Sequence, residues 1–350
     1  METLLREIKK IKGLDKEAMA DCQRRWNQIA KPLHSLGKIE DMLVAIAGIT
    51  KETDISLEKK ALVVMCADNG VVSEGVTQTG KEVTAIVAEN FKRGNTCTSL
   101  MSKRAGVDVF PVDIGIARDT NIINKKVMYG SNNLAREDAM PMEKTIEAIK
   151  VGISMVLELK EQGYKIIGTG EMGIGNTTSS SALAAALLGR SAKEVTGRGA
   201  GLDKEGLKRK VKVIEKALDL HQPKMEDPLS VLSQLGGLDI AGMVGLFLGG
   251  AIYRLPIVID GFISAVSALV AVRICPRVAD FMLASHFSKE PGFVMVMEGI
   301  KKSPCIYGDL SLGEGSGAVA LMPLLDMGVD IYRQMSTFGE NAIKDYEELV

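Results

Sequence analysis

Two glutamates stand in separate glycine-rich segments and could carry out acid–base chemistry together. Glu171 follows Gly170 in GTGEMGIGNTT, and Glu314 lies between Gly313 and Gly315 in LGEGSG. A carboxylate flanked by glycines can be presented to a ligand without crowding from neighbouring side chains. Two such carboxylates in one cleft suit general acid–base catalysis or stabilisation of a cationic transition state. A glutamate that caps a helix N-terminus explains the spacing around Glu314 equally well.

The first glycine-rich segment also resembles a phosphate-binding turn. Two of its glycines permit close approach of the backbone, and we expect free backbone N–H groups where a helix begins after them. A tight strand-to-helix turn without a ligand is the alternative. Arg198 and Lys210 are the candidate cations, and a solvated charge explains either one as well. The candidate phosphate residues of the turn are Gly173, Gly175, Asn176, Thr177 and Thr178.

Two other glycine patterns point to different enzyme classes. Gly168, Gly170 and Gly173 satisfy G-x-G-x-x-G, so an NAD-dependent oxidoreductase is an alternative function. That fold needs an acidic residue about 20 positions on, at the end of a strand, and Glu194 does not lie in a strand-like segment. GVTQTGKE has P-loop spacing, but Glu82 stands where a P-loop has Ser or Thr for magnesium. Glu82 therefore argues against a nucleoside triphosphatase.

The composition excludes several function classes. The 43 basic and 44 acidic residues give a net charge of −1, which argues against nucleic-acid or acidic-membrane partners. Three separated histidines and five cysteines without a CxxC indicate reduced thiols, no metal site and a cytoplasmic protein. The N-terminus lacks the apolar core of a signal peptide. Charged residues and a proline interrupt the apolar stretch 240–272, which we therefore assign to a buried core and not to a membrane span.

Strand-like and helix-like patterns alternate along the chain and must position these loops. This alternation predicts an α/β fold with a mostly parallel sheet flanked by helices, and functional loops at the carboxyl ends of its strands. We predict that residues 49–326 form this domain and that residues 1–48 and 327–350 form a small helical domain. The expected strand-to-loop segments are Ala61–Gly70, Val107–Gly115, Tyr164–Gly173 and Leu255–Gly261. The expected helices between them include Lys144–Glu161, Lys204–Leu220 and Ala241–Ile252.

Seven segments, in order from about residue 60 to about residue 325, resemble nicotinate-nucleotide–dimethylbenzimidazole phosphoribosyltransferases. They are ADNGVVSEGVTQTGKEVT, GTGEMGIGNTTSSSALAAALLG, VTGRGAGLD, GGLDIAGMVGLFLGGA, PIVIDGFISAVSALVA, ASHFSKEPG and LSLGEGSGA. Asn69 departs from the family, in which many members have His after the Asp. TQTGKEVT lacks the aromatic residue and the proline often found there. Both departures fall where the acceptor base is expected, so the identity of that base stays open.

The resemblance implies a metal- and cofactor-independent transfer of phosphoribose from nicotinate mononucleotide to 5,6-dimethylbenzimidazole or a related base. The product would be the α-linked nucleotide of the cobamide lower ligand. It further implies a homodimer with a Rossmann-like large domain, in which Glu314 is the catalytic base and Glu171 a second active-site glutamate. The phosphate would lie at 173–178 and Lys210. The base pocket would include Thr77, Gln78 and Leu312. A non-catalytic subunit of a heteromer is the remaining alternative.

Overall fold

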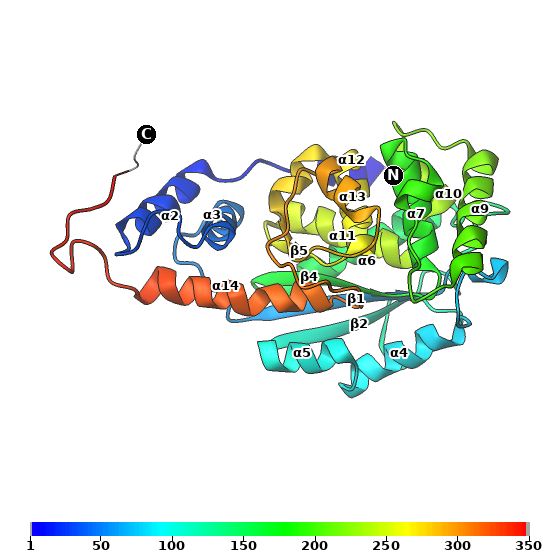
Figure 1. Cartoon of the computed structure of the whole chain (residues 1–350), viewed down its shortest axis with the longest axis horizontal. Helices are drawn as coiled ribbons and strands as arrows, with labels where there is room; N and C mark the ends of the chain where they lie inside the picture. Colours follow the sequence, from blue (N-terminus) through cyan, green and yellow to red (C-terminus); the bar gives the residue numbers. More distant parts are fainter. Residues whose placement is uncertain (1, 348–350) are drawn as a thin grey trace.

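The computed structural model describes residues 2–347, and its centre is one six-stranded sheet. Every strand pair in it is parallel, and the strand order is β3-β2-β1-β4-β5-β6. The predicted α/β class and the four predicted strands, which are β1, β2, β4 and β5 in Figure 1, are therefore confirmed. Strands β3 and β6 are additional. The strands are β1 (Lys60–Ala67), β2 (Val107–Gly115), β3 (Ile123–Asn124), β4 (Ile166–Met172), β5 (Ile257–Ile259) and β6 (Met282–Ala284).

Strands β1 and β4 are buried on both faces, which explains the almost continuous apolar sequence of β1, whereas β4 also contains glycines, Thr169 and Glu171. Gly168 and Gly170 lie inside β4 and not in the turn after it. A Cβ on Gly168 would lie 3.1 Å from the Ala318 side chain, and one on Gly170 would lie 2.8 Å from the Glu314 carbonyl oxygen. These glycines let another segment approach the strand, so the dinucleotide-fingerprint interpretation is wrong. The NAD-dependent alternative loses its basis with it.

Helices cover both faces of the sheet. In Figure 1, α6 (Met142–Glu161), α11 (Leu238–Tyr253) and α12 (Phe262–Ile274) lie above it, and α4 (Glu82–Arg93) and α5 (Cys97–Ala105) lie below. Helices α6 and α11 cross closely because both present glycines at the contact. The other helices around the sheet are α7 (Asn176–Leu188), α8 (Ala192–Val195), α9 (Lys204–His221), α10 (Pro228–Leu235), α13 (Phe293–Gly299) and α14 (Ser316–Gln334), with 3₁₀ turns η1 (Gly70–Glu74) and η2 (Pro276–Phe281).

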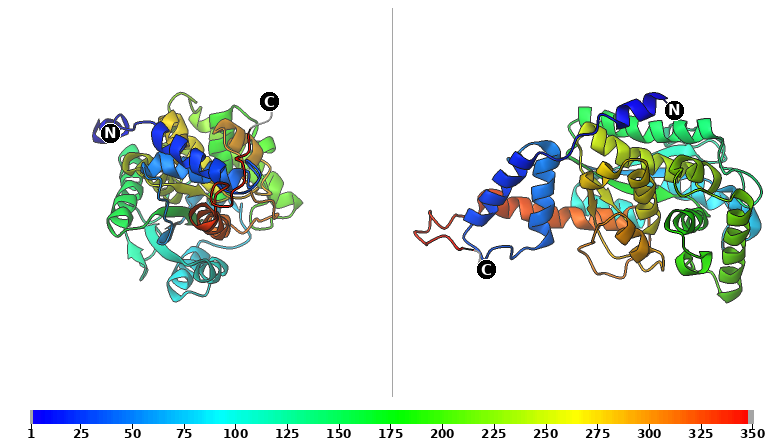
Figure 2. Two further views of the ribbon diagram at one scale, coloured as in Figure 1. Left: turned by 90° about the vertical axis from the view of Figure 1, so that its left-hand side faces the viewer. Right: turned by 90° about the horizontal axis from the view of Figure 1, so that it is seen from above.

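Helices near the N-terminus and the C-terminal part of the chain lie together at one end of the elongated molecule, whereas residues 2–8 lie over its main body (Figure 2). There α2 (Lys16–Gln28) and α3 (Lys38–Thr50) pack with the C-terminal half of α14. The rings of Trp26 on α2 and Tyr332 on α14 lie 5.2 Å apart. Helix α1 (Glu2–Ile8) instead packs on α11. The expectation of a helical tail is wrong beyond Gln334, where residues 335–347 run on without another helix. The division at residues 48 and 327 falls inside α3 and α14, and it stays a proposal.

The apolar stretch 240–272 forms α11, β5 and α12 in the core, as predicted. Among residues 2–347, none of the helices is both long enough and apolar enough to cross a bilayer.

Candidate active site

A cavity of about 240 Å³ opens at the carboxyl ends of β1, β4 and β5. The chain crosses from the β1 side of the sheet to the β4 side at this point, and ligands of open α/β sheets bind at such a switch in strand order. Loops from distant parts of the sequence line it. The predicted residues on its wall are Thr77, Gln78, Glu171, Gly173, Gly175, Asn176, Thr177, Leu312 and Glu314.

Two predicted phosphate residues do not reach the wall. Thr178 is fully buried in the first turn of α7, and its N–H donates to the carbonyl oxygen of Gly175 at 2.9 Å. The N–H of Asn176 likewise donates to the carbonyl oxygen of Gly173 at 3.0 Å. The expectation that these N–H groups are free is therefore wrong, because the turn itself uses them. Lys210 is buried behind the wall.

The two turn glycines are needed for packing. Gly175 has φ +97°, and a Cβ there would lie 2.9 Å from the Val72 side chain. A Cβ on Gly173 would lie 2.5 Å from the carbonyl oxygen of Ala67, at the end of β1. The turn therefore needs glycine to fit against β1 and η1. From the sequence we expect these glycines to allow close approach to a ligand. The contacts show instead that they allow the turn to pack against the protein itself.

Glu314 sits on a strained loop. Gly313, Glu314 and Gly315 have φ values of +80°, +62° and +88°, and a non-glycine residue held in this region costs about 1–3 kcal/mol. Its carboxylate does not cap α14. Instead Oε2 accepts a hydrogen bond of 3.1 Å from the Thr98 hydroxyl on α5. Burial raises the pKa of Glu314, and the Thr98 bond opposes that rise. A carboxylate with a raised pKa is a stronger base near neutral pH.

Glu171 lies directly beside this loop. The backbone N–H of Glu314 donates to Glu171 Oε1 at 3.2 Å, and the Asn176 amide donates to Glu171 Oε2. The same amide donates to Asp239 Oδ2 at 2.9 Å, so one side chain bridges two buried carboxyl groups. Burial raises the pKa of Glu171 to about 8, against the Asn176 bond and with a contribution from Asp239. Burial also raises the pKa of Asp239 to about 6. Glu171 is thus mostly protonated at neutral pH.

The raised pKa of Glu171 can be tested by measuring thermal stability at different pH values. From its ordinary pKa of 4.5 to about 8, folded Glu171 keeps a proton that the unfolded chain has lost, so stability falls as pH rises. Glu171→Gln lacks this penalty. We expect its Tm, relative to wild type, to rise by a few degrees between about pH 5 and about pH 8.5. Comparing the two pH values cancels any pH-independent cost of the amide. The exposed variant Glu52→Gln is the control, and an equal pH dependence in both variants would contradict the assignment.

A second polar cluster lies on another part of the cavity wall. Lys210 Nζ donates to Thr177 Oγ1 at 2.8 Å and to the carbonyl oxygen of Gly197 at 3.2 Å. Burial lowers the pKa of Lys210 to about 8, against the charge of Glu290. Arg198 lines the cavity directly. The structure thus places one cation on the wall and a second one behind Thr177, and both can attract an anion.

The residues expected at the base pocket line the cavity, but Asn69 does not. Asn69 is buried and accepts a hydrogen bond of 3.2 Å from the Ser179 hydroxyl. The departure from the family at this position therefore lies behind the wall. Leu312 is 49% exposed, and Gln78 donates to the carbonyl oxygen of Gly201.

Sequence reasoning missed four residues around the two glutamates. Asp260 and His286 line the cavity, Asp239 bonds Asn176, and Thr98 bonds Glu314. A usable signal existed for Asp260, because it ends an apolar strand segment just as Asp68 does. Across residues 2–347, no three His, Cys, Asp or Glu side chains are grouped so as to hold a metal ion.

The chain is similar to known proteins along nearly its whole length. A family model described as Phosphoribosyltransferase matches residues 11–343. The chain is similar to the nicotinate-nucleotide–dimethylbenzimidazole phosphoribosyltransferase of Acetivibrio thermocellus, with 46% identity over 99% of this chain and 100% of the relative. It is 45% identical to the protein of the same name from Clostridium acetobutylicum, over 98% of each chain. The crystal structure of CobT from Thermus thermophilus matches with a TM-score of 0.89 and 36% identity, over 94% of this chain and 100% of that one.

Proposed function

The chain belongs to the nicotinate-nucleotide–dimethylbenzimidazole phosphoribosyltransferase family, and we propose that it catalyses the reaction named there. In this reaction phosphoribose passes from nicotinate mononucleotide to 5,6-dimethylbenzimidazole or a related base, and nicotinate leaves. The product is the α-linked nucleotide for a cobamide lower ligand. The observation that carries the proposal is the meeting of Glu171 and Glu314 on one cavity wall, joined by the Glu314 N–H.

The chemistry needs a base at the acceptor. One imidazole nitrogen attacks C1′ of the ribose with inversion while the bond from C1′ to the nicotinate nitrogen breaks. The nitrogen–carbon bond makes the proton on the other imidazole nitrogen acidic. Glu314 takes that proton, since its carboxylate lies on the cavity wall and its pKa is raised by burial.

In this proposal, Glu171 and the second polar cluster act on the donor, nicotinate mononucleotide. Positive charge on the nicotinate ring and on the ribose favours the ionised form of Glu171, because an opposite charge nearby lowers the pKa of a carboxyl group. Ionised Glu171 then stabilises the charge that grows on the ribose in the transition state. The phosphate binds near Thr177, where Lys210 and Arg198 supply positive charge.

A competition assay tests the reaction and identifies the acceptor. Purified protein is incubated with nicotinate mononucleotide and a mixture of 5,6-dimethylbenzimidazole, other benzimidazoles, adenine and phenols, and the products are read by mass. We expect one or more α-linked nucleotides together with free nicotinate. If no base yields a nucleotide, the non-catalytic subunit becomes the better hypothesis.

Activity should survive removal of metal ions. Nicotinate leaves as a pyridine, so no pyrophosphate has to be neutralised, unlike in transfers from a pyrophosphorylated ribose. We expect product formation in excess EDTA to stay within about twofold of the untreated rate, since the step relies on general-base catalysis by Glu314. The check is the initial rate before and after chelation. A large loss that magnesium or zinc restores would contradict the prediction.

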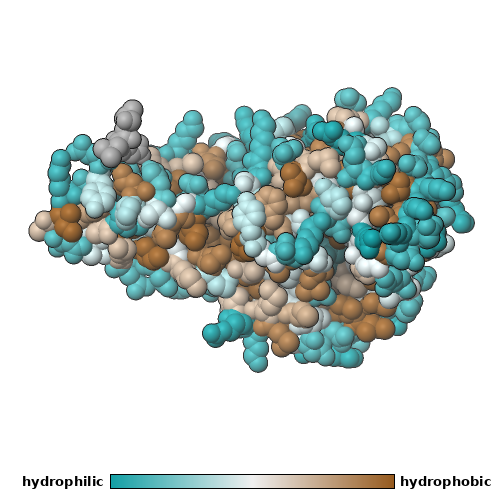
Figure 3. All heavy atoms as spheres, in the orientation of Figure 1, coloured by the Kyte–Doolittle hydropathy of each residue, from teal (hydrophilic) through white to brown (hydrophobic). Residues whose placement is uncertain are grey.

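The homodimer stays part of the proposal. Apolar side chains gather along the lower edge of the molecule, over α4 and α5 (Figure 3). Ile86 on α4 is 49% exposed and Leu100 on α5 is 60% exposed. Exposed apolar residues on two adjacent helices support an interface with a second copy at this face.

A further inference from the structure

One buried carboxylate holds the loop that carries Glu314. Asp260 follows β5 and is 2% exposed. Its Oδ1 accepts the N–H groups of Gly317 at 2.7 Å and Ala318 at 3.1 Å, and its Oδ2 accepts that of Gly315 at 3.1 Å. These groups belong to the start of α14, where the N-cap residue has no side chain to accept them. A carboxylate from another strand therefore satisfies the unpaired N–H groups of this helix start.

The loop has a conformation that needs such an anchor. Three consecutive residues, 313 to 315, have positive φ, and the middle one is Glu314 itself. On the other side of the loop, the Glu314 N–H donates to Glu171 Oε1. The backbone on either side of the Glu314 Cα is thus held by a buried carboxyl group. Strained conformations persist where the surroundings over-determine them.

We propose that Asp260 is a positioning residue, whose bonds to Gly315, Gly317 and Ala318 hold Glu314 in its strained conformation with its carboxylate facing Thr98 and the cavity. The inference rests on the proposed function, in which Glu314 is the base. Asp260 need not touch either substrate to act in this way. Its effect on the reaction passes through the loop backbone.

His286 packs against the start of α14, close to Asp260. The ring lies so close to the start of α14 that a Cβ on Gly317 would overlap His286 Nδ1, and the Ser285 hydroxyl lies 3.1 Å from that nitrogen. Burial raises the pKa of Asp260, whereas His286 and the three N–H bonds oppose the rise. The His286 ring therefore leaves no room for a side chain at position 317, beside Asp260.

Asp260→Asn is the sharpest variant, because it keeps the shape and removes one acceptor. The amide oxygen can still accept from Gly317 and Ala318, whereas the amide NH₂ group would face the N–H of Gly315. We expect kcat to fall about 10- to 100-fold, since a misplacement of about 1 Å in a catalytic group costs this much. The KM of each substrate should stay within about threefold, since only the base moves. A smaller neutral variant, Asp260→Ser, extends the test if the amide prevents folding.

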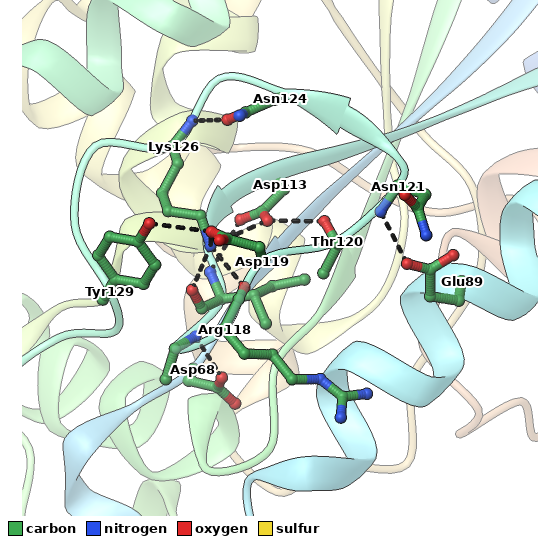
Figure 4. A network of polar contacts seen from close by, with 12 residues as sticks. Asp68, Glu89, Asp113, Arg118, Asp119, Thr120, Asn121, Asn124, Lys126 and Tyr129 are labelled. Carbon is green, nitrogen blue, oxygen red and sulfur yellow. Dashed lines mark hydrogen bonds and ion pairs between the residues drawn. The ribbon is translucent and has the colours of Figure 1, made fainter.

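Asp113→Asn is the matched control. Asp113 is equally buried at the end of β2, and its carboxylate accepts the Ile116 N–H at 2.9 Å and the Thr120 hydroxyl at 2.7 Å (Figure 4). It anchors the loop after β2 and does not line the cavity. We expect this variant to lower the Tm and to leave kcat of the folded protein within about twofold of wild type, because the control disturbs a loop without a reacting group.

Hydrogen exchange separates failure of this inference from failure of the proposed function. Amide exchange in peptides covering 310–320 should rise in Asp260→Asn and stay at the wild-type rate in Asp113→Asn. This readout needs no substrate. Faster exchange with a lowered kcat and nearly constant KM supports the inference. Unchanged exchange, or a folded Asp260 variant with wild-type kcat, overturns it. A wild-type protein without transferase activity overturns the proposed function, and the exchange then still tests the anchor.

Discussion

We expect Glu314→Gln to lower kcat with a benzimidazole acceptor by about 10²- to 10⁴-fold, the usual contribution of general-base catalysis. Glutamine has the size of glutamate, and its amide oxygen can still accept the Thr98 hydroxyl bond. The amide cannot take up the imidazole proton. The KM of nicotinate mononucleotide should therefore stay nearly constant, because binding of the donor does not depend on this proton.

Steady-state kinetics with both substrates varied measures this effect. Glu40→Gln is the matched control, since Glu40 is a buried glutamate on α3 that bonds Lys31 at 2.7 Å, away from the cavity. That variant should change the Tm and leave kcat of the folded enzyme intact. If Glu314→Gln kept more than about half of the wild-type kcat, general-base catalysis by this residue would be ruled out.

The sheet could be predicted from the sequence where its strands are long and buried. Strands β1 and β4 have eight and seven residues, all of them buried, and the loops after them begin with an acidic residue and a glycine. The edge strands β3 and β6 have two and three residues, which is too short for any periodicity to appear. Their places are set by pairing with neighbouring strands, which the local sequence does not encode.

The active-site glutamates could be found because their own neighbours mark them. Glu171 and Glu314 each stand among glycines, and this local pattern is visible in the sequence. The groups that hold them come from far away in the chain. Thr98 is 216 positions from Glu314, and Asp260 is 55 positions from Gly315. No local pattern reveals such pairs.

Backbone bonding caused the clearest failure of the sequence analysis. The turn before α7 has the composition of a phosphate site, yet the N–H groups of Asn176 and Thr178 bond within the turn. Glycine was required there by φ and by packing on β1 and η1. Composition does not distinguish a glycine required by φ and packing from a glycine required by a bound phosphate. The phosphate hypothesis therefore now depends more on the side chains of Thr177, Lys210 and Arg198 than on the turn.

Lys210→Met is expected to weaken binding of nicotinate mononucleotide by about 10- to 100-fold, since a hydrogen bond to a charged group contributes about 1.5–3 kcal/mol. Methionine is unbranched and apolar, so it can occupy most of the buried space of the lysine. Free benzimidazole should bind as before, because its pocket is expected around Thr77 and Leu312. Calorimetric titration of each ligand into the folded variant measures both affinities.

The pH dependence separates a phosphate contact from a structural lysine. Burial lowers the pKa of Lys210 to about 8, and a bound phosphate must raise it again. Binding therefore takes up a proton above about pH 8, and wild-type affinity falls as pH rises further, whereas Lys210→Met lacks this fall. Lys302→Met is the control, since burial lowers the pKa of Lys302 as well but this residue lies off the cavity wall. If both variants lost stability and kept wild-type affinity with its pH dependence, Lys210 would be structural, and Arg198 would remain as the cation that meets the phosphate.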